Sequence, residues 1–342
     1  MLLAGDIGGT KTLLGLFEPG ERRPAAIAIG EFVTLDYEAL EEIIDRFLAE
    51  RRVAAARLTG VSVGVAGAVT DQVAHLTNVP WLVKASTIRS RFGVERAFVL
   101  NDLEALAHAV PVLAGDELAV LQEGVRVASG NIAVIAAGTG LGESMLLNVE
   151  GRFVPGESEG GHADFAARTP RELELVAALT RIFGRAEVEH VLSGPGLVNL
   201  YQFTHDAFGA ERNVQPRNMM PSKLCAGVDD VADPAELPAR ISAAAMERRC
   251  TACMEALEMF VSAYGAEAGN IALRTVATAG VYVGGGIAPR ILPVLRTGSF
   301  IDAFRAKPPM SDLVGRIPVA VILNPQAGLL GAAVHANALH WR

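Results

Sequence analysis

Residues 2–20 read LLAGDIGGTKTLLGLFEPG, and residues 131–153 read NIAVIAAGTGLGESMLLNVEGRF. In both stretches an apolar run leads into a glycine-rich turn, at Gly8–Gly9 in the first and at Gly138–Gly142 in the second, and another apolar run follows it. Apolar runs bounded by turn residues are typical of two strands joined by a tight turn. Because the pattern occurs twice, it predicts two topologically related halves.

Strands and helices alternate along the rest of the chain, which predicts an α/β fold. Residues 57–69 and 97–102 are strand-like, whereas residues 38–52 have apolar side chains at helical spacing. Residues 210–240 are rich in Pro, Asp and Ala and predict a loop. Further helices are expected at about 170–184, 195–208 and 240–265, a strand running through glycines into a helix at 278–292, a last strand at 319–324 and a closing helix at 325–341.

Bulk composition narrows the class of protein. The 342 residues suggest two domains, and 51% hydrophobic with 20% charged residues indicates folded cores. A net charge of −8 without a Lys/Arg block argues against a nucleic-acid partner. We expect no membrane span and no signal peptide, hence a cytoplasmic protein. An anionic ligand would then need backbone N–H groups and a metal ion to hold it.

The three cysteines, Cys225, Cys250 and Cys253, are too few and odd in number for a disulfide framework. Cys250 and Cys253 form a CxxC pair, and a zinc site would need two further ligands nearby. No such ligands are evident in the sequence, and residues 243–260 resemble one continuous helix. The pair is therefore predicted to lie one turn apart on a helix face and to serve ordinary packing.

Three glycine-rich turns are candidates for binding phosphate or nucleotide. The turn after Asp6 can direct backbone N–H groups towards an anion, and Asp6 can hold a metal ion through water. The Gly138 turn lacks P-loop spacing and leads into a strand, so it favours a phosphate-binding hairpin over a dinucleotide fingerprint. The Gly284–Gly286 run, a predicted strand-to-helix junction, permits close approach of a ring or ribose. Taken singly, each could instead be an ordinary turn.

Polar side chains at other strand ends and loops complete the candidate site. Asp102 follows a strand and starts a helix, so it is either a helix N-cap or a carboxylate that accepts a proton from a substrate hydroxyl. Glu159 and His162, separated by two glycines, can both point into one pocket and suit vicinal sugar hydroxyls. The alternative for this pair is an ordinary polar loop. Glu189 is a further candidate, and its alternative is an ordinary surface charge.

In order along nearly the whole chain, these segments resemble the bacterial glucokinases of the hexokinase and actin-like ATPase superfamily. The pair EGGHADF (159–165) and EHVLSGPGLVNLY (189–201) is the most specific part of the resemblance, whereas DIGGT is shared across the superfamily. The other matching segments are LTNVPW (76–81), LND (100–102), GTGLG (138–142), GGGIAPR (284–290) and NPQAGLLGAA (324–333).

The resemblance implies an ATP-dependent glucokinase that phosphorylates the 6-hydroxyl of D-glucose. It implies Asp102 as the general base, and Mg²⁺ bound with ATP and held by Asp6 at most through water. The sugar would contact Asn78, Asn101, Asp102, Glu159, His162 and Glu189. ATP would contact Asp6, Gly8, Gly9, Thr10, Lys11, Gly138, Thr139, Gly140, Gly284, Gly285 and Gly286.

The resemblance further implies a two-lobed actin-like ATPase (ribonuclease H-like) fold with the active site in the interdomain cleft. The expected domains are a small one at 1–108 plus 324–342 and a large one at 109–323. A homodimer is also expected.

Two rival functions remain open from the sequence. A kinase for another sugar, such as mannose or an N-acetylated hexosamine, would share the glycine turns and differ only in its pocket. A non-catalytic sensor or repressor would be expected to lack the Asp102 carboxylate or to carry a helix-turn-helix before the first strand. The cysteine-rich zinc motif of repressor-related sugar kinases is absent after His162.

Overall fold

The structure is a computed structural model that describes residues 1–76, 79–156, 158–207, 225, 227–228 and 230–338. The chain forms two compact units, which we describe one at a time. The first comprises Met1–Leu118, Val149–Glu157 and Asn324–Arg342, and the second comprises Ala119–Asn148 and Ser158–Leu323. Among the described residues, no helix is both long and apolar enough to cross a membrane.

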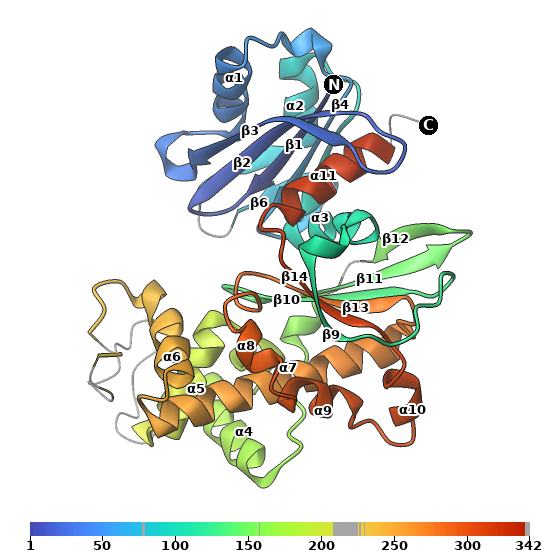
Figure 1. The fold of residues 1–342 in the computed structure, drawn as a ribbon. Helices are drawn as coiled ribbons and strands as arrows, with labels where there is room; N and C mark the ends of the chain where they lie inside the picture. Colours follow the sequence, from blue (N-terminus) through green and yellow to red (C-terminus); the bar gives the residue numbers. More distant parts are fainter. Residues whose placement is uncertain (77–78, 157, 208–224, 226, 229, 339–342) are drawn as a thin grey trace. The chain divides into compact units, whose positions relative to one another are not determined.

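The first unit is built on a five-stranded sheet with the order β3-β2-β1-β4-β8 (Figure 1). β1, β4 and β8 run parallel, so their carboxyl ends share one edge, while β2 pairs antiparallel with both β1 and β3. A small separate sheet has the order β5-β6-β7. The strands are β1 (Leu2–Ile7), β2 (Lys11–Glu18), β3 (Ala25–Val33), β4 (Gly60–Val65), β5 (Val69–Thr70), β6 (Val73–His75), β7 (Leu82–Lys84) and β8 (Ala97–Asn101).

Helices cover this sheet with two separate apolar clusters. α1 (Leu40–Glu50) and α2 (Ala85–Phe92) bury Phe47, Ile88 and their neighbours in one cluster with strand residues. α11 (Ala327–Ala338) joins α3 (Asp102–Ala109) in the other, where small side chains allow close packing of the two helices. The second cluster matters for the site because it places the beginnings of α3 and α11 near the carboxyl ends of the parallel strands.

The second unit contains most of a six-stranded sheet with the order β12-β11-β10-β13-β14-β9, whose edge strand β12 belongs to the segment Val149–Glu157 of the first unit. β10 pairs antiparallel with β11 and parallel with β13, and β13 pairs parallel with β14. The strands are β9 (Leu118–Gln122), β10 (Ile132–Ala137), β11 (Leu141–Val149), β12 (Arg152–Gly156), β13 (Gly280–Gly284) and β14 (Val319–Ile322).

A 25-residue helix, α7 (Thr251–Thr275), runs through the helical part of this unit and packs against α5, α6 and α9 (Figure 1). It is buried along most of its length because neighbours cover it on several faces, as expected for a core helix. The other helices are α4 (Pro170–Phe183), α5 (Gly194–Thr204), α6 (Leu237–Met246), α8 (Leu292–Leu295), α9 (Ser299–Arg305) and α10 (Ser311–Val314).

The predicted hairpins are confirmed as β1–β2 and β10–β11, but two predicted helices are wrong in detail. The single helix expected at about 240–265 is interrupted between α6 and α7, where Arg248 has a φ of 55° and cannot continue a right-handed helix. The strand-to-helix junction after Gly286 is instead a series of turns that begins at Gly285, with a φ of 80°, and reaches α8 only at Leu292.

Candidate active site

In the first unit, candidate carboxylates gather at the carboxyl edge of the sheet. Asp6 stands opposite Gly64 on β4, and Val65 stands opposite Asn101 on β8, so the ends of the three parallel strands coincide. Gly64 makes this possible: a Cβ there would lie 2.7 Å from the Cβ of Ala105, so only glycine lets α3 pack directly on β4.

The side chains of Asn101 and Asp102 both accept a hydrogen bond from the first turn of α3. The N-cap is Asn101 and not Asp102: its Oδ1 accepts a hydrogen bond from Leu103 N at 2.9 Å, and its Nδ2 donates to the Gly67 carbonyl at 3.0 Å. Asp102 is exposed in the first helical turn, and its Oδ1 also accepts from Leu103 N, at 2.8 Å. The helix N-terminus therefore stabilises the ionised form of an exposed carboxylate.

Asp6 is the most perturbed carboxyl of this edge. Burial, followed by the nearby negative charge of Asp102, raises the pKa of Asp6 to about 6, against a smaller opposing effect of Lys11. Gly328, in the first turn of α11, lies so near that a Cβ would be 2.8 Å from Asp6 Oδ2. An oxygen-only donor at a negative edge suits Mg²⁺, which prefers carboxylate and water ligands.

The first glycine turn is held by a residue that sequence reasoning missed. Gly8 N donates to the Lys11 carbonyl at 3.0 Å, and the buried Thr34, which is not part of the turn, is hydrogen-bonded to it. Thr34 N donates to the Thr10 carbonyl at 3.0 Å, and its Oγ1 donates to the Gly8 carbonyl at 2.9 Å. Thr34 follows β3 directly, and only the pairing of β2 with β3 brings it here.

Lys11 forms an exposed ion pair with Glu31 of β3, with Nζ and Oε2 3.0 Å apart. Such exposed pairs contribute at most about 1 kcal/mol, so Lys11 can exchange this partner for another anion at little cost. Its contact with a phosphate stays a prediction. Gly9 and Thr10 complete the turn, and Thr10 is exposed.

In the second unit, the Gly138–Gly142 turn is fastened to the beginning of α5. Gly138 N donates to the Gly140 carbonyl, and Gly194 N donates to the Gly138 carbonyl, both at 2.8 Å. Glu189 Oε2 accepts from Leu141 N at 2.8 Å, and a Cβ on Gly140 would lie 2.6 Å from that oxygen. Glu189 is therefore in direct contact with the glycine turn, while Thr139 at its tip is exposed.

The Gly284–Gly286 run lies beside the same turn, because Ala136 on β10 stands opposite Gly284 on β13. Gly285 adopts a φ of 80°, and a Cβ there would lie 2.2 Å from the Ala137 carbonyl oxygen. The fully buried Tyr264 joins the two strands: its hydroxyl accepts from Ala137 N at 3.1 Å and donates to the Gly284 carbonyl at 3.3 Å. Sequence reasoning missed Tyr264 because its partners are about 20 and 127 residues away.

These two turns offer a backbone surface that suits a nucleotide. Nothing lies within 4 Å of where a Cβ would stand on Gly138 or Gly286, so a ligand can approach the main chain closely. By contrast, a hollow of about 180 Å³ in the first unit contains none of the candidate residues and is lined by Phe17, Arg23, Asn324 and others. The strand ends, and not that hollow, carry the candidate chemistry.

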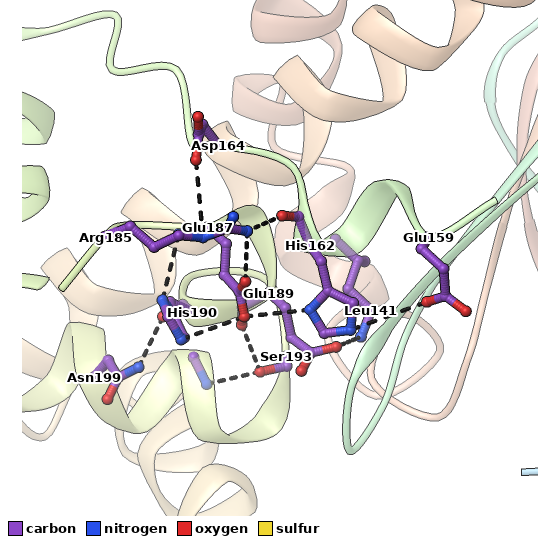
Figure 2. A network of polar contacts seen from close by, with 11 residues as sticks. Leu141, Glu159, His162, Asp164, Arg185, Glu187, Glu189, His190, Ser193 and Asn199 are labelled. Carbon is purple, nitrogen blue, oxygen red and sulfur yellow. Dashed lines mark hydrogen bonds and ion pairs between the residues drawn. The ribbon is translucent and has the colours of Figure 1, made fainter. Parts of the chain in front are cut away.

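The loop around His162 forms a network of imidazoles and carboxylates (Figure 2). His162 Nδ1 lies 3.3 Å from Glu187 Oε1, and His162 Nε2 lies 4.0 Å from Glu159 Oε2. Ligand atoms of His162, Glu187 and Glu189 all lie within 4.8 Å of one another. The structure thus brings together Glu159, His162 and Glu189, which the sequence singled out.

Glu187 makes the most contacts of this network, although the sequence analysis did not identify it as a candidate. Its carboxylate also accepts from Arg185 Nη2 at 2.8 Å and lies 3.4 Å from His190 Nε2. Burial by itself would raise the pKa of Glu187, but the hydrogen bond from His162, the charge of His190 and the hydrogen bond from Arg185 hold it below its usual value. The signal that could have revealed Glu187 is its place two residues before Glu189 in the EVEH sequence.

An ionised Glu187 decides the tautomer of His162. A carboxylate without a proton only accepts hydrogen bonds, so Nδ1 of His162 must carry the hydrogen. In the neutral imidazole the Nε2 atom is then an acceptor, and it faces the exposed Glu159. Two neighbouring acceptors of this kind suit the adjacent hydroxyls of a sugar. Asn78, the remaining predicted sugar contact, lies outside the described residues.

A model of the glucokinase family matches residues 3–339 of the chain. The chain belongs to the glucokinase family. The glucokinase of Synechocystis sp. is 36% identical to it over 98% of this chain and 97% of that protein. The glucokinase of Nostoc punctiforme is 36% identical over 99% of both. The solved glucokinase of an Antarctic psychrotroph superposes with a TM-score of 0.83 at 27% identity and covers 98% of each chain.

This membership confirms the family resemblance seen in the sequence motifs and, with it, the two-lobed actin-like ATPase fold. It does not test the roles of individual residues. The assignments of Asp102, Asn101, Lys11 and the glycine turns therefore remain predictions, each with the geometry described above.

Proposed function

We propose that this protein transfers the γ-phosphoryl group of ATP to the 6-hydroxyl of D-glucose, releasing glucose 6-phosphate and ADP. The observation that carries the proposal is the contact of Glu189 with the second glycine turn. One carboxylate belongs to the sugar-type network of His162 and also accepts the Leu141 N–H of a turn suited to phosphate. In a chain that matches the glucokinase family over 3–339, this joins sugar recognition to phosphate recognition.

Asp102 is the proposed general base. Its carboxylate is exposed and is kept ionised by the start of α3, so it can accept the proton of the 6-hydroxyl as the oxygen attacks the γ-phosphorus. The new P–O bond forms while the bond to the β–γ bridging oxygen breaks and ADP leaves with the electron pair. Phosphoryl transfer of this kind needs positioning and charge stabilisation more than covalent help.

The remaining groups hold the substrates. We propose that Asn78, Asn101, Glu159, His162 and Glu189 bind the sugar hydroxyls. The backbone N–H groups of Gly8, Gly9, Thr10, Gly138, Thr139 and Gly140 would face the phosphates, and Gly284, Gly285 and Gly286 would face the adenosine. Mg²⁺ bound with ATP supplies positive charge on the phosphates, and the Asp6 carboxylate suits a water-mediated contact to it. We also propose a homodimer, which sedimentation velocity at several concentrations would test.

ADP release from MgATP tests the substrate. The sugars are glucose, mannose, fructose, N-acetylglucosamine and N-acetylmannosamine, with a reaction lacking sugar as the blank. We expect turnover with glucose well above the others, and glucose 6-phosphate as the product by an NADP-coupled dehydrogenase assay. Faster turnover with another sugar would contradict the substrate, and none with any sugar would favour a non-catalytic sugar-binding role.

A further inference from the structure

All three cysteines of the chain meet one histidine in the second unit. The ligand atoms of His205, Cys225, Cys250 and Cys253 all lie within 4.8 Å of one another. They come from separate parts of the chain: the residue after α5, an isolated position at 225, and the beginning of α7. Such convergence of every thiol of a chain is not required by packing.

The histidine is oriented as metal-bound histidines are. His205 Nδ1 lies 2.8 Å from the carbonyl oxygen of Tyr201, which can only accept, so Nδ1 carries the hydrogen. That leaves the lone pair of Nε2 on the side of the thiols, 3.4 Å from Cys250 Sγ. A hydrogen bond from the second ring nitrogen to a backbone carbonyl is the usual outer support of a ligating histidine.

The interruption between α6 and α7 puts the CxxC pair at a helix start and not in a helix interior. Cys250 is the N-cap of α7, with extended backbone at φ −146° and ψ 123°, and Cys253 lies in its first turn. Helix N-termini stabilise thiolates through free N–H groups and the helix dipole.

Cys253 is fully buried. A buried thiolate is stable only when its charge is compensated, and a bound cation at this position would compensate it. Besides the three sulfurs, the cluster contains a neutral nitrogen donor and no carboxylate among the described residues, a soft set that favours zinc over magnesium or calcium.

We propose that His205, Cys225, Cys250 and Cys253 bind one Zn²⁺ ion in a closed, structural Cys₃His site. Zn–S bonds of about 2.3 Å and a Zn–N bond of about 2.0 Å place tetrahedral ligand atoms ~3.5–3.8 Å apart. Small side-chain rotations bring atoms within 4.8 Å to these distances. Since the protein fills all four positions, the ion has no free site for a substrate.

The ion would stabilise the pair of helices that supports the sugar network. His205 ends α5, and the first turn of the same helix holds Glu189: Ser193 Oγ donates to the Glu189 carbonyl at 2.8 Å and accepts from Gly196 N at 2.9 Å. α5 packs along α7, whose start carries Cys250 and Cys253. Loss of the ion is therefore expected to lower the thermal stability of this unit more than it lowers turnover.

Metal analysis of the full, untagged chain tests the site directly. Protein from zinc-supplemented cells is dialysed against metal-free buffer with reductant and analysed by inductively coupled plasma mass spectrometry. We expect equimolar zinc in the wild type and far less in Cys225→Ser and Cys250→Ser. His75→Gln is the matched control, because His75 is exposed on β6 and should leave zinc content unchanged.

Cobalt gives a second readout that does not depend on the variants folding. Co²⁺ in place of Zn²⁺ should show the intense visible bands of a tetrahedral thiolate site, and equimolar Zn²⁺ should abolish them. Zinc-free wild type that takes up neither metal would overturn the proposal, as would a Cys250–Cys253 disulfide in zinc-free protein. Undiminished zinc in Cys225→Ser would overturn the four-ligand set.

Discussion

The β1–β2 and β10–β11 hairpins have the same local form, yet each carries a carboxyl with a raised pKa in a different setting. Asp6 precedes the first turn, with a pKa raised to about 6 by burial and then by Asp102. Glu143 follows the second turn, with a pKa raised to about 8 by burial and then by Glu267. Burial is the main cause in both, so a raised pKa alone assigns a role to neither carboxyl.

Their neighbours make the difference. Asp6 belongs to the strand edge that also carries the exposed Asp102, where an incoming cation can compensate both charges. Glu143 faces Arg274 and Glu267 inside the second unit, with Arg274 Nη1 3.7 Å from its Oε2. A Cβ on Gly160 would lie 2.2 Å from the same oxygen, so Glu143 supports the loop of Glu159 and His162 from beneath.

The largest expected effect is that of Asp102→Asn, which removes the proposed base while keeping an oxygen that can accept from Leu103 N. We expect kcat to fall ~10²–10⁴-fold, with the KM for glucose changed only a few-fold. Asp116→Asn, an exposed change in the same unit, is the control and should keep full activity. Near-normal turnover of the Asp102 variant would refute the base assignment.

Glu189→Gln tests the proposed role of Glu189 in binding glucose. The amide oxygen can still accept from Leu141 N, but the charge that binds a sugar hydroxyl is lost. Hydrogen bonds to charged groups contribute about 1.5–3 kcal/mol, so we expect kcat/KM for glucose to fall ~10–100-fold. Steady-state kinetics measure this, with the exposed Glu174→Gln on α4 as the control. An unchanged kcat/KM would remove Glu189 from the site.

Glu143→Gln tests whether the second carboxyl is purely structural. The folded chain keeps the Glu143 proton up to about pH 8, whereas the unfolded chain loses it near the ordinary value of 4.5. The wild type therefore loses stability as the pH rises between these values, and between pH 5 and pH 8 the glutamine variant should lack up to about 3.5 kcal/mol of that decline. Urea unfolding at pH 5 and pH 8 measures it, with the exposed Glu258→Gln as the control. Identical declines in both proteins would contradict the assignment.

Asp6→Asn should separate stability from activity. The folded-state pKa of about 6 exceeds the ordinary value of 3.8, so this group also destabilises the wild type as the pH rises through that interval. At pH 7 the asparagine variant should be up to about 3 kcal/mol more stable, yet less active with MgATP. Thermal unfolding with and without substrate measures both, and the exposed Asp36→Asn is the control. A variant that is less stable than the wild type at pH 7 would contradict the raised pKa of Asp6.

Individual residues show how much of the fold and of the candidate site could be predicted from the sequence. The glycine turns, the strands around them and the EGGH loop were predictable because tight turns and period-two or helical spacing are local properties. Arg248 is a counter-example: nothing in its neighbourhood marks a left-handed residue, so the start of α7 was missed. That error also concealed Cys250 as a helix N-cap.

By itself, the sequence determined the α/β class, both hairpins and the family, and it singled out Asp102, Glu159, His162 and Glu189 as candidate site residues. Only the tertiary structure decided which residues hold the turns and the histidines in place. Thr34 binds the first glycine turn, Tyr264 joins the strands that lead into the other two turns, and Glu187 lies between His162 and His190. The tertiary structure also brought His205 and Cys225 to the CxxC pair. The physical reason is distance along the chain, because contacts between residues far apart in sequence follow from how whole elements pack and leave no local pattern.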